Sequence, residues 1–389
     1  MVHRVSTPPR SNLIRVSAAF EPIEYTTRIQ RAAALAASQG IDALLVTPGP
    51  DLRYLTGYHA HALERLTCLV VPSEGPVSLV VPELEIGTAQ ASPVGDLAIE
   101  LLSWQETEDP YSLTARLLGN PGSGKRIAVD DRMWAVKAIE LRKAMAQAEQ
   151  LAAGVVLSEL RMRKSAAEIA QLQRAGAAID AVHARVSEWL RPGRSENEVA
   201  ADIADAIAEE HETVDFVIVA SGPNGSSPHH MASDRILERF DVVVVDIGGT
   251  TDAGYCSDST RTYALGVPDD GFLADYNVLQ RAQEQACAAV APGMTCEEID
   301  AVARDLLSDA GLGDLFIHRT GHGIGLETHE EPYIVEGNTR RLEPGMAFSI
   351  EPGFYRPGMV GARIEDIVIC GDDGPLMCNN RPHELVVLD

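Results

Sequence analysis

The chain is 389 residues long, which exceeds what one compact core usually holds and predicts two domains. Hydrophobic residues account for 45% of the sequence and charged residues for 23%, as in an ordinary water-soluble globular protein. The formal net charge of -25 argues against nucleic acids and membranes as partners, because both are bound through basic patches.

The N-terminal 24 residues have no hydrophobic periodicity and are expected to form a loose arm, residues 1–24. Arginines and prolines interrupt this stretch, so it lacks the apolar run of a signal peptide. No other stretch approaches the ~20 apolar residues that cross a bilayer. The six cysteines contain no Cys-x-x-Cys pattern and are expected to be reduced and mostly buried. We therefore expect a cytoplasmic protein.

Residues 25–158 have the pattern of a small α/β domain. Apolar residues at helical spacing begin at Tyr25 and end before Gly40, and glycine is common just after a helix. The other elements predicted here are a strand at 41–47, a turn at 48–51, a hairpin at 66–81 and a strand at 127–129. Residues 54–61 follow a strand and are predicted to form a polar, aromatic surface loop.

A long helical segment is predicted to lead into the second domain, residues 159–389. Residues 134–163 are rich in alanine, leucine, glutamate, lysine and arginine, all strong helix formers. From Ile169 to Trp189, apolar residues recur at spacings of three, four and seven. This pattern predicts an amphipathic helix that ends before Pro192-Gly193.

The second domain contains an internal repeat. Pro192-Gly193 precedes a Ser-x-x-Glu sequence at 195–198, and Pro292-Gly293 precedes a Thr-x-x-Glu sequence at 295–298. Each sequence is a capping box that opens a helix, and such boxes are common enough to occur twice by chance. The shared Pro-Gly lead-in favours a duplicated half-domain of two helices and strands, with a site between the halves.

Two aspartates belong to a predicted hairpin in this domain. The β-branched run 242–245 predicts a buried strand that stops at Asp246. After a glycine-rich turn the chain returns through Asp258, so the hairpin would bring both carboxylates close together. Because buried carboxylates repel each other and resist desolvation, such a pair needs a cation or a shared proton.

Three further residues extend this pair to a candidate metal site. His322 lies between two glycines, which leave its imidazole accessible, and Glu351 and Glu365 lie inside or beside apolar strands. Each one alone is equally well explained as an ordinary loop or strand-edge residue. Together with the aspartates they make four carboxylates and one imidazole, a set that suits hard divalent cations and balances two of them.

The motifs that hold these residues occur in a characteristic order. They are Asp246-Ile247-Gly248, Tyr-Cys-Ser-Asp-Ser-Thr-Arg-Thr at 255–262, Gly-His-Gly-Ile-Gly-Leu-Glu-Thr-His-Glu at 321–330, Glu351-Pro352-Gly353 and Arg363-Ile364-Glu365-Asp366. This order resembles the pita-bread metallopeptidases, specifically the Xaa-Pro peptidases (prolidase and aminopeptidase P). Residues 41–46 and 54–57 resemble the creatinase-type N-terminal domain of that family. The resemblance covers about residues 25–389 and implies an α/β N-terminal domain followed by a duplicated pita-bread domain.

The resemblance also implies the cofactor and the reaction. The residues that match metal ligands are Asp246, Asp258, His322, Glu351 and Glu365. They would hold two divalent ions, manganese first and cobalt or zinc as alternatives. A hydroxide bridging the two metals would attack the carbonyl of an Xaa-Pro bond, in dipeptides or at peptide N-termini.

Further positions match the family's catalytic and substrate-binding residues. His229 and His329 match histidines that contact the substrate, although His230 could take the first role. Glu351 also matches the residue that passes a proton to the leaving nitrogen. His318 and Arg363 match substrate-binding positions. By the same resemblance we expect a homodimer that acts on proline-containing peptides.

Three questions stay open at this point. The motifs do not distinguish an Xaa-Pro dipeptidase from an Xaa-Pro aminopeptidase. A metal-independent, creatinase-like amidinohydrolase shares the two-domain fold, and so does a non-catalytic peptide-binding member of it. Both of the latter are expected to have lost metal ligands, whereas this chain retains all five.

Overall fold

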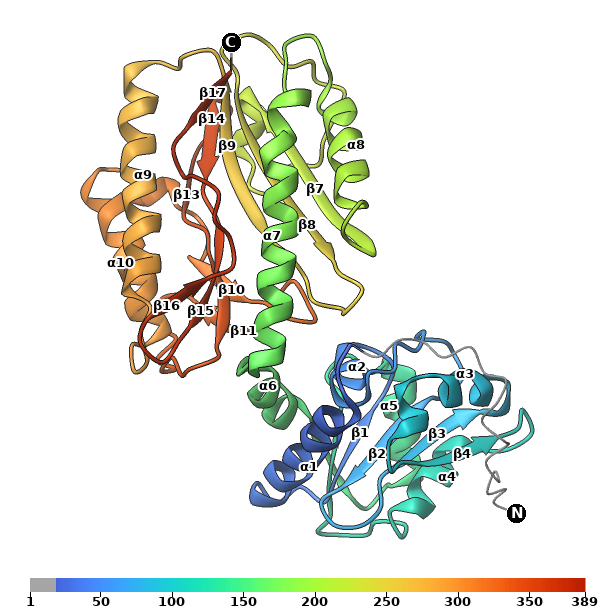
Figure 1. The fold of residues 1–389 in the computed structure, drawn as a ribbon. Helices are drawn as coiled ribbons and strands as arrows, with labels where there is room; N and C mark the ends of the chain where they lie inside the picture. The colour runs from blue at the N-terminus through green and yellow to red at the C-terminus, as the bar shows by residue number, and fades with distance from the viewer. Residues whose placement is uncertain (1–18, 389) are drawn as a thin grey trace. The chain divides into compact units, whose positions relative to one another are not determined.

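The computed structural model describes residues 19–388 and divides the chain into two units, Met1–Arg161 and Met162–Asp389. Most of the predicted N-terminal arm lies outside the described residues. Helix α1 (Pro22–Ser38) begins three residues before the predicted start, because proline is favoured in the first turn of a helix (Figure 1). The predicted boundary between residues 158 and 159 falls within helix α6 (Gly154–Met162).

A six-stranded sheet in the order β4-β3-β2-β1-β5-β6 organises the first unit. Its strands are β1 (Ala43–Val46), β2 (Cys68–Pro72), β3 (Ser78–Pro82), β4 (Glu100–Trp104), β5 (Arg126–Val129) and β6 (Glu149–Ala152). The helices that accompany them, besides α1, are α2 (Pro50–Thr56), α3 (Ile86–Ala91), α4 (Pro110–Leu117) and α5 (Ala135–Ala144). Every residue of β1 is buried, so both faces of the sheet are covered. The predicted α/β class of this unit is confirmed.

The predictions for two segments of this unit are wrong, in whole or in part. Residues 134–163 do not form one helix, because the edge strand β6 separates α5 from α6; parallel pairing with β5 overrides the weak strand propensity of its sequence. The predictions of a turn at 48–51 and a surface loop at 54–61 are wrong in part: residues 48–49 do form a turn, and residues 57–61 have no regular structure, with His59 and His61 exposed. Helix α2 begins at Pro50, and Tyr54 and Tyr58 are both buried.

Two sheets, each with a pair of helices packed on it, form the second unit. The first sheet has the order β17-β9-β8-β7 and the second β11-β10-β12-β15-β16. The strands of the first are β7 (Thr213–Ser221), β8 (Val242–Thr250), β9 (Ser259–Leu265) and β17 (Val386–Leu388). Those of the second are β10 (Gly321–Gly323), β11 (Glu330–Ile334), β12 (Ala347–Ile350), β15 (Asp366–Cys370) and β16 (Pro375–Met377). A hairpin of β13 (Gly353–Arg356) and β14 (Val360–Arg363) completes the strands of this unit.

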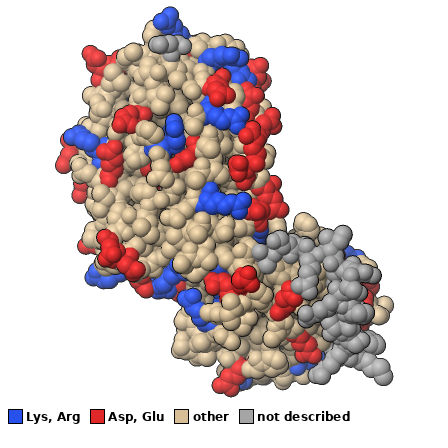
Figure 2. All heavy atoms as spheres, viewed as in Figure 1, with Lys and Arg blue, Asp and Glu red and all other residues tan. Residues whose placement is uncertain are grey.

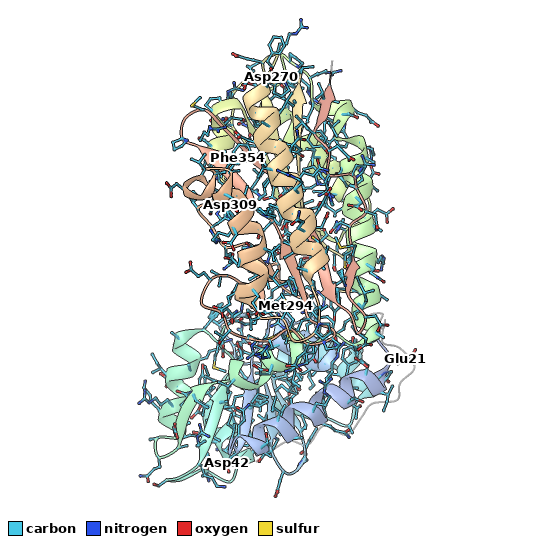
Figure 3. All side chains as sticks on the ribbon, turned by 90° about the vertical axis from the view of Figure 1, so that its left-hand side faces the viewer. Glu21, Asp42, Asp270, Met294, Asp309 and Phe354 are labelled. Atoms are coloured by element: carbon cyan, nitrogen blue, oxygen red, sulfur yellow. The ribbon has the colours of Figure 1, made fainter. Side chains whose placement is uncertain are left out.

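The helix pairs build two separate cores. Helices α7 (Ala166–Trp189) and α8 (Glu196–Ile207) share a core with β7, β8 and β9. Helices α9 (Asp270–Ala289) and α10 (Cys296–Asp309) share the other core with β12 and β15. Figure 3 shows α9 and α10 side by side, with Met294 in the connection between them and Asp270 and Asp309 at their far ends.

The predicted internal repeat is confirmed down to individual hydrogen bonds. Both capping boxes are formed, and Gly193 and Gly293 have the same left-handed backbone, with φ of 92°. The Gly193 N–H donates to Leu237 O at 2.9 Å, as the Gly293 N–H donates to Leu342 O at 2.8 Å. The two halves are therefore copies of one supersecondary unit.

Strand β8 differs from its prediction because it runs past Asp246 to Thr250 instead of stopping there. Val243, Val245 and Ile247 face the core that contains α7 and α8. Since side chains alternate along a strand, Asp246 points to the opposite face of the sheet. Thr260 of β9 is its partner in the antiparallel pairing.

Acidic and basic side chains are interspersed over the visible face of the second unit (Figure 2). Within residues 19–388, none of the helices has the length and apolar character needed to cross a membrane. All six cysteines are buried and free, as the sequence predicts.

Candidate metal centre

All five predicted metal ligands gather in the second unit. Their side chains, with that of His329, form three overlapping groups whose possible ligand atoms lie within 4.8 Å of one another. The groups are Asp246, Asp258 and Glu365; His322, Glu351 and Glu365; and Asp258, His322 and His329. Two of the three groups share Glu365 and two share Asp258, so the groups overlap at these two carboxylates.

Backbone and hydroxyl contacts fix the carboxylates that the two sheets contribute. The Glu365 N–H donates to Thr260 O at 3.1 Å, and Thr260 Oγ1 donates to Glu365 Oε2 at 2.8 Å. The Glu351 N–H donates to Thr320 O at 2.8 Å, and Ser349 Oγ donates to Glu351 Oε1 at 3.0 Å. These contacts hold Glu351 and Glu365 in place within the cluster.

His322 presents one ring nitrogen to the carboxylates. Its Nδ1 lies 3.1 Å from Gly323 O, to which it donates, so Nε2 is the ring nitrogen that faces the carboxylates. Nε2 lies 3.2 Å from Glu351 Oε1 and 3.6 Å from Asp258 Oδ2. A lone pair facing two carboxylate oxygens is repulsive unless a proton or a cation lies between them.

The carboxyl groups divide into two kinds by their pKa. Burial and the neighbouring carboxylates raise the pKa of Asp258 and of Glu365 well above the ordinary range. Burial also raises the pKa of Asp246, against the opposing charge of Arg363. At Glu351 burial is outweighed by the hydrogen bond and charge of His322, and the pKa falls to about 2. Such a split is typical of functional sites.

Two observations indicate that the residues of these groups can bind a metal ion. Asp246 Oδ1 is buried and has no hydrogen-bond partner, while its Oδ2 accepts from Arg363 Nη2 at 2.6 Å. A buried oxygen without a partner is costly in a protein, so it marks a place for a cation. The donor set is oxygen-rich with one or two imidazoles, which suits hard divalent ions.

A residue that the sequence did not single out, Tyr355, connects two of the predicted substrate-binding residues. Arg363 Nη1 donates to Tyr355 Oη at 2.8 Å, and Tyr355 Oη lies 2.9 Å from His318 Nε2. His318 Nδ1 lies 2.7 Å from Arg319 O, to which it donates. Burial lowers the pKa of His318, so its ring is neutral and Nε2 accepts from the tyrosine.

The three histidines predicted or considered for substrate contact differ in their surroundings. His329 lies against His322, with ring centroids 3.9 Å apart, and burial lowers its pKa to about 4. His229 is exposed, and its charge contributes to the lowered pKa of both His318 and His329. His230 instead lies 2.8 Å from Glu196, a buried carboxylate outside the metal site. The neighbour of His229 is thus already engaged elsewhere.

Four other contributors to this region were not found from the sequence. They are Thr260, Ser349, Arg319 and Glu196. Thr260 lies in a motif that was recognised, and its position opposite Asp246 could have been predicted from the hairpin register. Ser349 contacts Glu351 only two residues away. Arg319 and Glu196, like Tyr355, act through contacts between segments distant in the sequence, which no local pattern predicts.

Comparisons with known proteins identify the family. Residues 170–372 match the model of metallopeptidase family M24, and residues 28–163 match the creatinase/prolidase N-terminal domain. The crystal structure of dipeptidase PepE from Mycobacterium ulcerans is 53% identical, has a TM-score of 0.91, and the match covers 95% of this chain and 99% of that one. A prolidase from Thermococcus sibiricus is 37% identical and has a TM-score of 0.87, and the match covers 94% of this chain and 99% of that one.

A curated relative leads to the same family. The Xaa-Pro dipeptidase of Lactobacillus delbrueckii subsp. lactis is 35% identical over 361 residues, which cover 90% of this chain and 95% of that protein. The family model spans more than half of the chain, and the relatives are covered almost completely. The chain belongs to metallopeptidase family M24.

Proposed function

We propose that the protein is a metal-dependent peptidase that hydrolyses Xaa-Pro dipeptides with two divalent ions in its site. The observation that carries this proposal is the convergence of Asp246, Asp258, Glu351 and Glu365 on His322, with one buried aspartate oxygen left without a partner. The names of the relatives, Xaa-Pro dipeptidase and prolidase, support the substrate class. A creatinase-like reaction and a non-catalytic role are not favoured, because the full ligand set is present.

The ions would be held by the five carboxylate and imidazole ligands predicted from the sequence. When bound, they would supply a Lewis acid for the scissile carbonyl and make a water molecule acidic enough to act as a nucleophile at neutral pH. Manganese is our first choice, because four carboxylates and one histidine form a hard, oxygen-rich donor set. Cobalt and zinc are the alternatives.

The chain's own residues supply the remaining steps. Glu351 matches the family residue that takes a proton from the attacking water and passes it to the proline nitrogen as that nitrogen leaves. His329 is uncharged at neutral pH and can donate one N–H to the carbonyl oxygen as negative charge develops there. By the family resemblance, His229 would contact the substrate.

Arg319 supports a dipeptide as the substrate. Its guanidinium stacks on the ring of Tyr333 at 4.4 Å from the centroid, and Tyr333 is the direct partner of His322 in the pairing of β10 with β11. Directly opposed residues of antiparallel strands have their side chains on the same face. The charge of Arg319 also contributes to the lowered pKa of His329, and we propose that the guanidinium binds the C-terminal carboxylate of a dipeptide.

The test compares Gly-Pro, Gly-Pro amide and a longer Gly-Pro peptide as substrates of the full chain and of Arg319→Gln. We expect the full chain to prefer Gly-Pro over its amide. Arg319→Gln should lose about 10-fold or more in kcat/KM on Gly-Pro, since a charge-assisted hydrogen bond is lost, and change little on the amide. The exposed arginine Arg281 on α9 provides the control variant Arg281→Gln. Equal losses on both substrates would exclude a carboxylate contact.

Two further properties belong to the same proposal. By family resemblance we propose a homodimer, which light scattering of the purified chain would test. A cytoplasmic location is supported by six buried, unpaired thiols, since disulfides rarely form in reducing compartments.

A further inference from the structure

A buried carboxylate outside the metal site holds the segment that carries His229. Glu196 is the first residue of α8, and its side chain is fully buried. Its oxygens accept hydrogen bonds from four residues of the segment 221–233. The donors are Ser221 N and Oγ (2.8 and 2.6 Å), Asn224 Nδ2 (3.0 and 3.1 Å), His230 Nε2 (2.8 Å), and Ser233 N and Oγ (3.1 and 2.7 Å).

These hydrogen bonds keep the carboxylate charged. Burial by itself would raise the pKa of Glu196, but the donors from Ser221, Ser233 and His230 lower it to about 2. The side chain therefore accepts at both oxygens throughout the neutral pH range. A carboxylate offers about four lone-pair sites, so the seven contacts leave neither oxygen of Glu196 free for another partner.

His229 lies between two anchored neighbours. On one side, Pro228 O accepts from Arg363 Nη1 at 3.3 Å, and Arg363 also binds the metal-site residue Asp246. On the other side, the ring of His230 is held by Glu196. His229 itself is exposed. The two neighbours thus fix the backbone from which this histidine projects.

The internal repeat shows that a charge is not needed at this point of the fold. The Glu196 N–H donates to Arg235 O at 3.0 Å, just as the Cys296 N–H donates to Arg340 O at 2.9 Å in the other half. Cys296 begins α10 as Glu196 begins α8, and it is equally buried. The same backbone arrangement forms around a thiol, so the carboxylate of Glu196 serves the segment 221–233 and not the start of the helix.

We infer that Glu196 is a positioning residue for peptide hydrolysis, which acts through His230 and Ser233 to hold His229 beside the metal site. The inference rests on the proposed function, in which His229 contacts the substrate. Glu196 does not touch the reacting atoms. Its effect must therefore disappear when the imidazole of His229 is absent.

A double-mutant cycle tests that requirement. Glu196→Gln should lower kcat/KM on Gly-Pro by about 10-fold, since it weakens hydrogen bonds to a buried charge, with unchanged metal content. In a His229→Ala background the same substitution should change kcat/KM by less than about 2-fold, because the positioned group is already gone. A similar loss in both backgrounds would mean a purely structural role and would overturn the inference.

Two comparisons separate positioning from a general loss of folding. His230→Gln keeps an N–H donor for Glu196 and should retain most of the activity that His230→Ala loses. Glu198→Gln is the matched control on the same helix: its carboxylate accepts from the Ser195 N–H at 2.8 Å in the capping box. This control should leave kcat/KM within about 2-fold of the full chain.

Hydrogen–deuterium exchange of the segment 221–233 gives a readout that does not depend on activity. In the full-length chain, Glu196→Gln should speed exchange in this segment, and Glu198→Gln should not. If the unmodified chain fails to hydrolyse Gly-Pro, the proposed function is wrong, and the exchange still decides whether Glu196 holds the segment. Unchanged exchange in Glu196→Gln would refute the anchoring itself.

Discussion

The buried acids of the metal centre differ in what compensates their charge. Asp246 has the guanidinium of Arg363 at 2.6 Å, whereas Glu365 accepts from the hydroxyl of Thr260 at 2.8 Å. Neighbouring carboxylates raise the pKa of Asp258 and Glu365 well above the ordinary range. These two residues thus depend most on bound cations.

Replacing either of these two ligands should remove activity and leave the fold intact. We expect Asp258→Asn and Glu365→Gln each to lower kcat/KM on Gly-Pro by about 100-fold or more, because the charge of the two proposed dications would then be undercompensated. Metal content by mass spectrometry and circular dichroism are measured on the same samples. Asp252→Asn, at an exposed carboxylate in the same hairpin connection, is the control. A variant with full metal and near-normal turnover would remove that residue from the ligand set.

A nearby thiol is expected to have no catalytic role. Cys256 lies two residues before Asp258, but its Sγ is 3.5 Å from Thr250 Oγ1, and burial raises its pKa to about 12. A neutral, buried thiol acts as a small apolar side chain. Cys256→Ala should therefore keep kcat/KM within about 3-fold of the full chain. Less than a tenth of the activity, together with reduced metal content, would make it a ligand.

At the scale of elements, the start of α8 contains both a motif that predicts the helix, the capping box, and a residue with a proposed functional role, Glu196. The capping box from Ser195 to Glu198 is readable in the sequence and recurs at Thr295 and Glu298. Glu196 lies inside the same motif but bonds to residues 25 to 37 positions away. Local pattern thus predicts where the helix begins, and tertiary contacts decide what its first residue does.

The lowered pKa of Glu196 predicts an acid-sensitive contribution to stability. Its folded-state pKa of about 2 lies below the ordinary value of 4.5, so its contribution is complete above pH 4.5 and is lost as the pH falls toward 2. The shift corresponds to about 3 kcal/mol in the free energy of unfolding. Urea unfolding between pH 6 and 3 measures it: the difference between the full chain and Glu196→Gln should shrink on acidification. A pH-independent difference would contradict the assignment.

The same distinction explains what the sequence could and could not predict. Helix α7, the hairpin of β2 and β3 and all five clustered ligands carry strong local signals, either periodicity or motif order. Strand β6 carries none, because Glu149–Ala152 is a strand only through its pairing with β5. Tyr355 was missed for a similar reason: its role arises from its position between Arg363 and His318.

At the scale of the whole molecule, the three candidate ligand groups all lie in the second unit. We expect the N-terminal unit to contribute substrate selection and assembly, as the family resemblance implies. A fragment of residues 156–389 should then bind metal but show a lower kcat/KM on Xaa-Pro dipeptides than the full chain. A folded, metal-replete fragment with unchanged kcat/KM would contradict the expected role of the N-terminal unit in substrate selection.

The most direct test of the account is a metal titration of chelated full-length protein, with Gly-Pro hydrolysis followed at each addition. We predict no turnover in the metal-free protein and activity that rises with manganese until about two ions are bound per chain, the number that we propose for the site. The same samples should bind much less metal when Glu365 is replaced by glutamine. Full hydrolysis of Gly-Pro by protein shown to be metal-free would contradict the central claim.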